Sequence, residues 1–368
     1  MTHSSGYPGP LWSMRIVDAI DASVHLCPPP VIFRAQFQQD YSIVRKALKI
    51  IGGLLAVIVI AFTAYVASRQ HLNFDKTTPF PDVVASTDSA VIERGRYIVR
   101  DLAPCASCHA GQAERAAAAE GEDVPLVGGY VFEIPPGKFY TRNLTADKET
   151  GLGNVSDKAI ARAIRYGVGH DGRALLPFME MQGLSDDDLQ AVVSYLRTMS
   201  PVRNEVPPHA YTTLGKVVKA TAMANPVGPA ATPPVRAPHG ASVETGKYIV
   251  ESVSLCWACH TERSPMTGAL VGPRFAGTTE FTEADDPGHS WSPPNITSDP
   301  ETGRLGHITE DQFIARFRQG RLLPGSPMPW QSFSRMADDD LRSVYRYLKS
   351  LPPVKRDNGP PVVDVKKG

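Results

Sequence analysis

The sequence predicts a mainly α-helical protein in which two tandem copies of one domain follow an N-terminal transmembrane helix. Three observations support this prediction: a long apolar run near the N-terminus, an internal repeat, and helical spacing of apolar residues within each copy. Formal charge is balanced, with 38 basic and 38 acidic residues, so nothing in the composition indicates a nucleic-acid partner.

The apolar run ALKIIGGLLAVIVIAFTAYVA covers residues 47–67 and contains one charged residue, Lys49. A helix of this length would span roughly 30 Å, the thickness of the hydrocarbon core of a bilayer. A buried core helix would show a polar stripe, and a cleaved signal peptide would have a shorter run before a small-residue cleavage site. A retained anchor therefore fits better than either alternative. Basic residues are more numerous before the run, which places the N-terminus in the cytoplasm.

The chain beyond this run repeats itself. The segment ERGRYIVRDLAPCASCH at 93–109 aligns without a gap with ETGKYIVESVSLCWACH at 244–260. Two later pairs also align: NLTADKETGLG with NITSDPETGRLG, and LSDDDLQAVVSYL with MADDDLRSVYRYL. The chain therefore contains two copies of one domain, joined by a segment rich in proline and alanine that reads as a semi-rigid spacer.

These features divide the chain into successive segments. They are a cytoplasmic N-terminal extension (1–46), the transmembrane helix (47–67), a juxtamembrane linker (68–88), the first copy (89–200), the Pro/Ala-rich linker (201–240), the second copy (241–355) and a C-terminal tail (356–368).

Each copy is expected to be helical, with long Gly- and Pro-rich loops at 111–155 and 261–307 and no run of alternating strands. Serine N-caps, a TEDQ capping box, terminal glycines and following prolines mark the helix ends. The expected helices lie at 93–100, at 156–167, from Thr309 to Gly320, and from Ser185 and Ala337 to the next proline.

The motif Cys-x-x-Cys-His occurs once in each copy. Its residues are Cys105, Cys108 and His109, and Cys256, Cys259 and His260. A thioredoxin-like redox pair would follow a strand in a βαβ unit, which the sequence does not show. A zinc site would need a second Cys or His pair in each copy, and the remaining cysteine, Cys27, precedes the membrane run. Covalent haem attachment uses both thiols and places the adjacent histidine beneath the ring, so the motifs predict two haem c groups.

The second axial ligand of each iron must come from well downstream of the motif. In the second copy Met328, which lies between two prolines, is the candidate, 68 residues after the motif histidine. In the first copy Met179 is favoured over Met181 because it follows the motif histidine at a similar distance of 70 residues. The metal ligands are therefore predicted to be His109 with Met179, and His260 with Met328.

The order of these motifs, CxxCH, then N-[LI]-T-x-D, then a methionine before the DDDL helix, resembles bacterial class I (His/Met) c-type cytochromes. It is similar to the cytochrome c subunits of membrane-bound alcohol and gluconate dehydrogenases. The resemblance covers roughly 89–202 and 241–354, and it implies a helical fold around each haem and periplasmic electron transfer. Subunits of that family resemble one another in carrying three haems and in being held to the membrane from the C-terminal side. This chain departs from that pattern, because it has two motifs and an N-terminal membrane helix.

A haem iron with both axial positions filled has no site for substrate, so its use is to carry single electrons. We expect a dihaem cytochrome without catalytic residues, held by one helix in the cell inner membrane with its haem domains in the periplasm. Its redox partners would be a dehydrogenase or quinol oxidoreductase and a terminal oxidase of the respiratory chain. The alternative is a dihaem enzyme, peroxidase-like or thiosulfate-oxidising, if the first haem lacks a methionine ligand. Arg142, Arg173 and Arg321 could neutralise haem propionates, although a surface role is the simpler interpretation.

Overall fold

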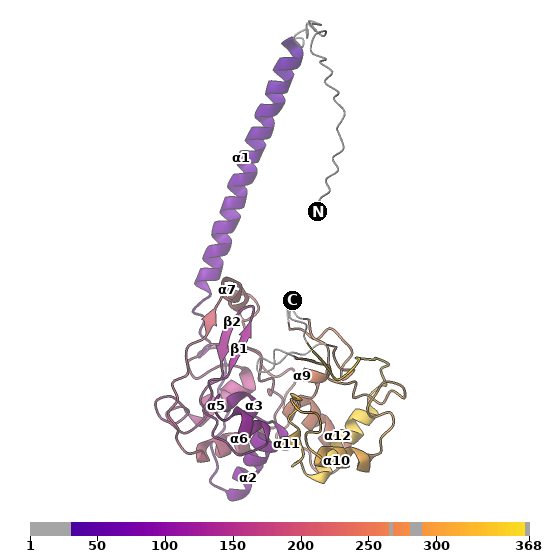
Figure 1. Cartoon of the computed structure of the whole chain (residues 1–368). Helices are drawn as coiled ribbons and strands as arrows, with labels where there is room; N and C mark the ends of the chain where they lie inside the picture. The colour runs from indigo at the N-terminus through magenta and orange to yellow at the C-terminus, as the bar shows by residue number, and fades with distance from the viewer. Residues whose placement is uncertain (1–30, 265–267, 280–288, 365–368) are drawn as a thin grey trace, which may run out of the picture. The chain divides into compact units, whose positions relative to one another are not determined.

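The computed structural model describes residues 31–264, 268–279 and 289–364, and the chain divides into two compact units, Met1–Thr63 and Ala64–Gly368. The described part of the chain is mostly helical, as predicted (Figure 1). The helices are α1 (Val31–Ser68), α2 (Ser89–Tyr97), η1 (Ile98–Leu102), α3 (Ala106–His109), α4 (Arg115–Ala119), α5 (Asp157–Tyr166), α6 (Asp186–Thr198), α7 (Thr213–Ala220), α8 (Val243–Tyr248), η2 (Ile249–Val253), α9 (Trp257–His260), α10 (Glu310–Arg318), α11 (Trp330–Phe333) and α12 (Asp338–Ser350). The strands are β1 (Val131–Ile134), β2 (Gly137–Tyr140), β3 (Ala210–Tyr211), β4 (His289–Trp291) and β5 (Val362–Asp364).

Helix α1 contains the apolar run and begins well before it. Its stretch Gln39–Ser68 reaches a mean hydropathy of 2.5 and is long and apolar enough to cross a membrane. Residues 31–46, which the sequence analysis assigned to an extension, are instead the first turns of this helix. The reason is local, since neither proline nor glycine interrupts the hydrogen-bond ladder between Val31 and Ile51.

The unit Ala64–Gly368 presents the same set of helices twice. In each copy a first helix (α2 or α8) continues as a π-helix (η1 or η2) and leads to the short helix that carries the Cys-x-x-Cys-His motif (α3 or α9). The last helix, α6 or α12, packs along the first helix of the same copy. The predicted helix 93–100 is therefore divided, because the ladder changes to a wider π turn after Tyr97.

One glycine in each copy permits this helix packing. A Cβ built on Gly95 would lie 1.9 Å from the carbonyl oxygen of Ala191, and one built on Gly246 would lie 1.9 Å from that of Ser343. The backbones of the two helices thus touch, and any side chain at these positions would force them apart.

The caps predicted for the later helices are confirmed. Ser156 caps α5, which ends at Gly167 in the left-handed conformation. Thr309 and Gln312 form the capping box of α10. Ser185 caps α6, so local sequence decided where these helices begin.

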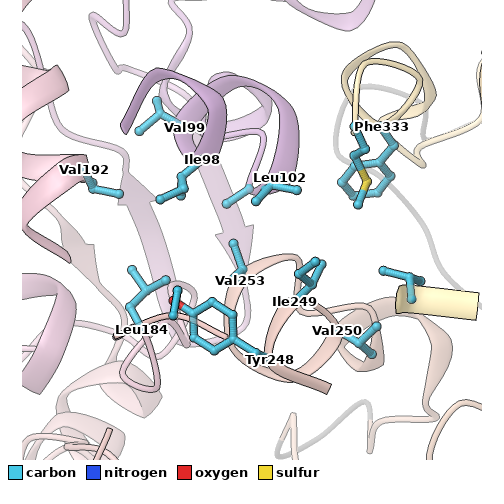
Figure 2. Packing of buried hydrophobic residues seen from close by; sticks show 14 of the residues in the cluster. Ile98, Val99, Leu102, Leu184, Val192, Tyr248, Ile249, Val250, Val253 and Phe333 are labelled. Atoms are coloured by element: carbon cyan, nitrogen blue, oxygen red, sulfur yellow. The ribbon is translucent and has the colours of Figure 1, made fainter. Parts of the chain in front are cut away.

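The two copies share one hydrophobic core. Figure 2 shows Ile98 and Leu102 of η1 facing a set of second-copy residues, and all of them are buried: Tyr248, Ile249 and Val253. Leu184 of the first copy and Phe333 of the second belong to the same cluster. The copies are therefore parts of one packed body, and each depends on the other to bury its apolar surface.

Polar contacts across this core are reciprocal. The hydroxyl of Tyr97 donates to Asp340 Oδ2 at 2.7 Å and accepts the N–H of Ala337 at 2.7 Å. Ala337 is the N-cap of α12 and has no capping side chain, so a tyrosine from the other copy takes that role.

The matching tyrosine makes the matching contacts. The hydroxyl of Tyr248 donates to Asp188 Oδ2 at 2.7 Å and accepts the N–H of Ser185 at 3.0 Å. Burial, then the neighbouring carboxylate, raises the pKa of both tyrosines, so both hydroxyls keep the proton that they donate. Each copy thus caps the last helix of the other, which is the pattern of a two-fold interface within one chain.

The stretches expected to be loops contain regular structure. Strands β1 and β2 form an antiparallel hairpin within 111–155, and β3, from the Pro/Ala-rich linker, adds a third strand. Strand β5 of the C-terminal tail pairs with β4. These expectations were wrong because strands of two to four residues have too few positions to show alternation, and because β3 and β5 pair with strands that are distant in sequence.

The linker is docked on the first copy. It contains α7, capped by Thr212, whose Oγ1 accepts the N–H of Gly215 at 3.1 Å. Further on, the N–H of Ala237 donates to Asp187 Oδ1 at 3.0 Å at the start of α6. The linker thus has specific partners and does not act as a free spacer.

Replacing Gly95 or Gly246 by alanine should destabilise the protein by about 1–3 kcal/mol, because the new methyl group overlaps the facing helix backbone. Thermal unfolding followed by far-UV circular dichroism measures the effect. The control is Glu93→Ala on the exposed face of α2, which should change stability by less than about 0.5 kcal/mol. Equal unfolding temperatures for Gly95→Ala and Glu93→Ala would contradict the close helix contact.

Candidate functional site

Each Cys-x-x-Cys-His motif occupies a single helical turn. In the first copy the N–H of His109 donates to the carbonyl of Cys105 at 2.8 Å, and in the second that of His260 donates to the carbonyl of Cys256 at 3.0 Å. Residues three and four apart in a helical turn lie on the same side. The spacing therefore places the two thiols and the imidazole of each motif on one side of its helical turn.

Both motif histidines are buried, with 8% of His109 and 7% of His260 exposed. Nδ1 of His109 lies 2.9 Å from the carbonyl oxygen of Arg142, and Nδ1 of His260 lies 2.9 Å from that of Pro294. A carbonyl can only accept, so each Nδ1 carries the hydrogen and each Nε2 keeps its lone pair. Burial lowers the pKa of both rings, which favours the neutral form. This is the state of an imidazole that binds iron through Nε2.

The carbonyl that receives this hydrogen bond is held by the asparagine next to it. Asn143, only 2% exposed, donates from Nδ2 to the carbonyl of Val202 at 2.8 Å and accepts the N–H of Thr145 at 2.9 Å. Asn295 repeats both bonds in the second copy. The Asn-[LI]-Thr segments are thus buried structural elements that fix the ring of each histidine, and the repeat of these three residues was the sequence signal for them.

The cysteines have the properties of protected thiols. Burial raises the pKa of Cys105 and of Cys256 to about 12. A thioredoxin-like pair works through a thiol whose pKa is lowered, so this environment argues against redox catalysis by the cysteines themselves. Within the described ranges no three His, Cys, Asp or Glu side chains gather as a metal site, which also argues against structural zinc. Cys27 lies outside the described residues.

The two thiols and the neutral histidine of each copy therefore fit covalent haem. Thioether formation would consume the two thiols of each motif, and the free Nε2 would supply a nitrogen ligand to the iron. Cys105, Cys108 and His109 would hold one haem, and Cys256, Cys259 and His260 the other.

The structure places the three candidate methionines differently. Met328 precedes α11 and packs, partly buried, against the hydrophobic core. Met181 packs against the core in the same way, whereas the side chain of Met179 is 37% exposed. Spacing along the chain thus favours Met179 as the counterpart of Met328, while packing favours Met181.

Basic side chains gather beside the first site. Burial first, then Arg173 and Arg142, lowers the pKa of His209 to about 4, and burial with Arg173 lowers that of Lys219. Asp171, 2.8 Å from Arg173, is the acidic partner within this group. Such a positive region would stabilise the propionates of a haem. His209 and Lys219 come from the linker, and the sequence analysis missed them because it treated the linker as a spacer.

The cytochrome c family matches residues 92–200, which include the first motif and the last helix of the first copy. The chain therefore contains a cytochrome c domain. Such a domain implies covalently bound haem c, as predicted, and a role in electron transfer.

Known relatives extend the similarity into the second copy. The cytochrome c subunit of alcohol dehydrogenase (quinone) from Gluconobacter oxydans is 31% identical over 288 residues, covering 73% of this chain and 56% of the relative. The gluconate 2-dehydrogenase cytochrome c subunit from Pantoea cypripedii is 28% identical, covering 72% of this chain and 60% of the relative. A diheme cytochrome c-type protein from Cereibacter sphaeroides is 25% identical, covering 68% of this chain and 83% of the relative.

These findings confirm the predicted resemblance to dehydrogenase cytochrome c subunits. The chain spans less than two thirds of the length of the alcohol and gluconate dehydrogenase subunits. They are cytochrome subunits of dehydrogenases, in agreement with the prediction that this chain transfers electrons and is not itself the catalyst.

Replacing Asn143 by alanine should lower the free energy of unfolding by about 2–3 kcal/mol, because it leaves the buried N–H of Thr145 without its acceptor and removes one donor from the carbonyl of Val202. The unfolding temperature of the haem-loaded protein measures the effect. Asn154→Ala is the control, since Asn154 is exposed and donates one hydrogen bond, to the carbonyl of Lys148. A smaller effect at Asn143 than at Asn154 would contradict the role given to the buried asparagine.

Proposed function

We propose that this protein is a dihaem c-type cytochrome made of two tandem class I domains, which relays single electrons at the outer face of the cytoplasmic membrane. The observation that carries the proposal is the repeated geometry of the motif. In both copies a buried neutral histidine commits Nδ1 to a backbone carbonyl and shares its helical turn with two thiols. The family match covers the first copy, and the second follows from its equal geometry and from the diheme relative.

A bound haem supplies a one-electron couple. The thiols would anchor it, and the histidine Nε2 and a methionine sulfur would occupy both axial positions, leaving no place for a substrate. We assign the sulfur ligands to Met179 and Met328. A thioether ligand favours the reduced metal, so a His/Met pair raises the reduction potential relative to a His/His pair.

The proposed location rests on α1. Its length and hydropathy suit a single membrane span. The excess of basic residues before the run supports an N-terminus in the cytoplasm and, with it, haem domains in the periplasm. The relatives support a dehydrogenase as electron donor. A quinol oxidoreductase is the other donor class that we propose, and a terminal oxidase is the proposed acceptor.

One observation favours a second candidate function. The exposure of Met179 differs from the packing of Met328, so the first haem is where an axial position could open. A first haem without a methionine ligand would make the protein a dihaem enzyme of the peroxidase or thiosulfate-oxidising type.

Expression in a bacterial host that matures c-type cytochromes should yield a chain heavier by two haems than the bare polypeptide. Intact-mass spectrometry under denaturing conditions measures this, because thioether bonds survive unfolding. The Cys105→Ala/Cys108→Ala variant should keep one haem, and so should Cys256→Ala/Cys259→Ala. A parent chain carrying one haem or none would exclude the dihaem assignment.

Visible spectra of the oxidised protein should show two low-spin, methionine-ligated haems. Met328→Ala should convert one of them to a high-spin or water-ligated form, and Met179→Ala should convert the other, while Met181→Ala leaves both unchanged. The reverse result at Met179 and Met181 would assign the ligand to Met181 and keep the carrier function. A first haem that is high-spin in the parent would instead support the enzyme.

A further inference from the structure

The segment that carries Met328 is fastened to the first copy at its front end. This Met328 segment comprises residues 321–335. Arg321 donates from Nη1 to Glu120 Oε1 at 3.0 Å and from Nη2 to the carbonyl of Ala119 at 3.1 Å. Gln331 donates from Nε2 to the other oxygen of the same carboxylate, Glu120 Oε2, at 3.2 Å. One carboxylate of the first copy thus binds the Met328 segment on both sides of the methionine.

The back end of the segment is fastened as well. Arg335 donates from Nε to Asp101 Oδ1 at 2.6 Å, from Nη1 to the carbonyl of Gly121 at 3.0 Å and from Nη2 to that of Arg100 at 3.3 Å. The side chain of Asp101 is 2% exposed, so Arg335 and the nearby Arg96 compensate a buried charge. All of these acceptors belong to the first copy.

The corresponding segment of the first copy is held mainly by its own copy. Arg165 donates to the carbonyl of Gln182 at 2.7 Å, and Phe178 stacks on Phe132 of the β1–β2 hairpin at 4.4 Å between ring centroids. Toward the second copy, the described residues give it one ion pair, Glu180 with Arg263 at 3.8 Å. The Met328 segment is therefore held by several contacts with the first copy, whereas the methionine segment of the first copy has few contacts with the second.

We propose that Glu120, on the first copy, is a positioning residue for the axial sulfur of the second haem. The proposal rests on the proposed ligation by Met328. A surface segment detaches transiently from the rest of the protein, and each contact that holds it lowers the population of the detached form. The side chain of Arg321 is 16% exposed, so loss of its carboxylate partner would leave a largely buried cation poorly compensated. The second haem site is thus completed by the first copy.

The test uses the full-length, haem-loaded protein in detergent, with imidazole as a probe that binds ferric haem only when the methionine has moved away. In Glu120→Gln, imidazole should bind the second haem about three- to tenfold more tightly than in the parent, as expected for loss of a half-exposed charged hydrogen bond. The first haem should keep its parent affinity. The ligand methyl resonances in the NMR spectrum of the oxidised protein report each haem separately, and Met328→Ala identifies the second.

Glu122→Gln is the matched control, because it removes the same charge from an exposed side chain two residues away. Its imidazole affinities should equal those of the parent at both haems. Equal affinities in Glu120→Gln and Glu122→Gln would overturn the inference and leave the dihaem carrier intact. If Met328→Ala leaves both methionine resonances in place, the proposed ligation itself fails.

A double-variant cycle checks that the effect passes through Arg321. If the ion pair acts as one unit, Glu120→Gln/Arg321→Gln should bind imidazole no more tightly than the stronger of the two single variants. If Arg321→Gln changes the imidazole affinity of the second haem and Glu120→Gln does not, Arg321 acts on the haem propionates. That result would overturn the role of Glu120.

Discussion

The hydrogen bond from the motif histidine to a backbone carbonyl is the interaction on which the architecture of each site depends. It fixes the tautomer of the ring and therefore which nitrogen is available to a metal. The adjacent asparagine, which is bonded to the chain just beyond the last helix, helps to hold this carbonyl in place. The motif helix, the loop and the end of the last helix in each copy are thus joined through one buried contact.

Duplication has produced one body whose two sites are not independent. The copies bury a common core, and each supplies a tyrosine hydroxyl that caps the last helix of the other. In the proposed relay, the separation of the two redox centres would be set by rigid packing and not by a linker. The docked linker and the paired C-terminal tail reinforce the same body.

The contacts between the two copies are symmetric in the core of their interface and asymmetric at its rim. The tyrosine–aspartate pairs repeat in both directions, whereas the Met328 segment receives most of the ion pairs that cross at the rim. Under the proposed ligation, different bracing of the two methionine segments would give the two haems different properties.

The sequence by itself determined the helical class, the duplication, the two motifs and the ends of several helices, because these depend on residues close together along the chain. Serine and threonine caps and the three- and four-residue spacing of Cys-x-x-Cys-His need no distant partner. Only the tertiary structure decided how the copies join, where the short strands pair and what holds the Met328 segment. Tyr97 and Asp340, or Glu120 and Arg321, are separated by some two hundred residues or more, and no local pattern predicts that such side chains meet.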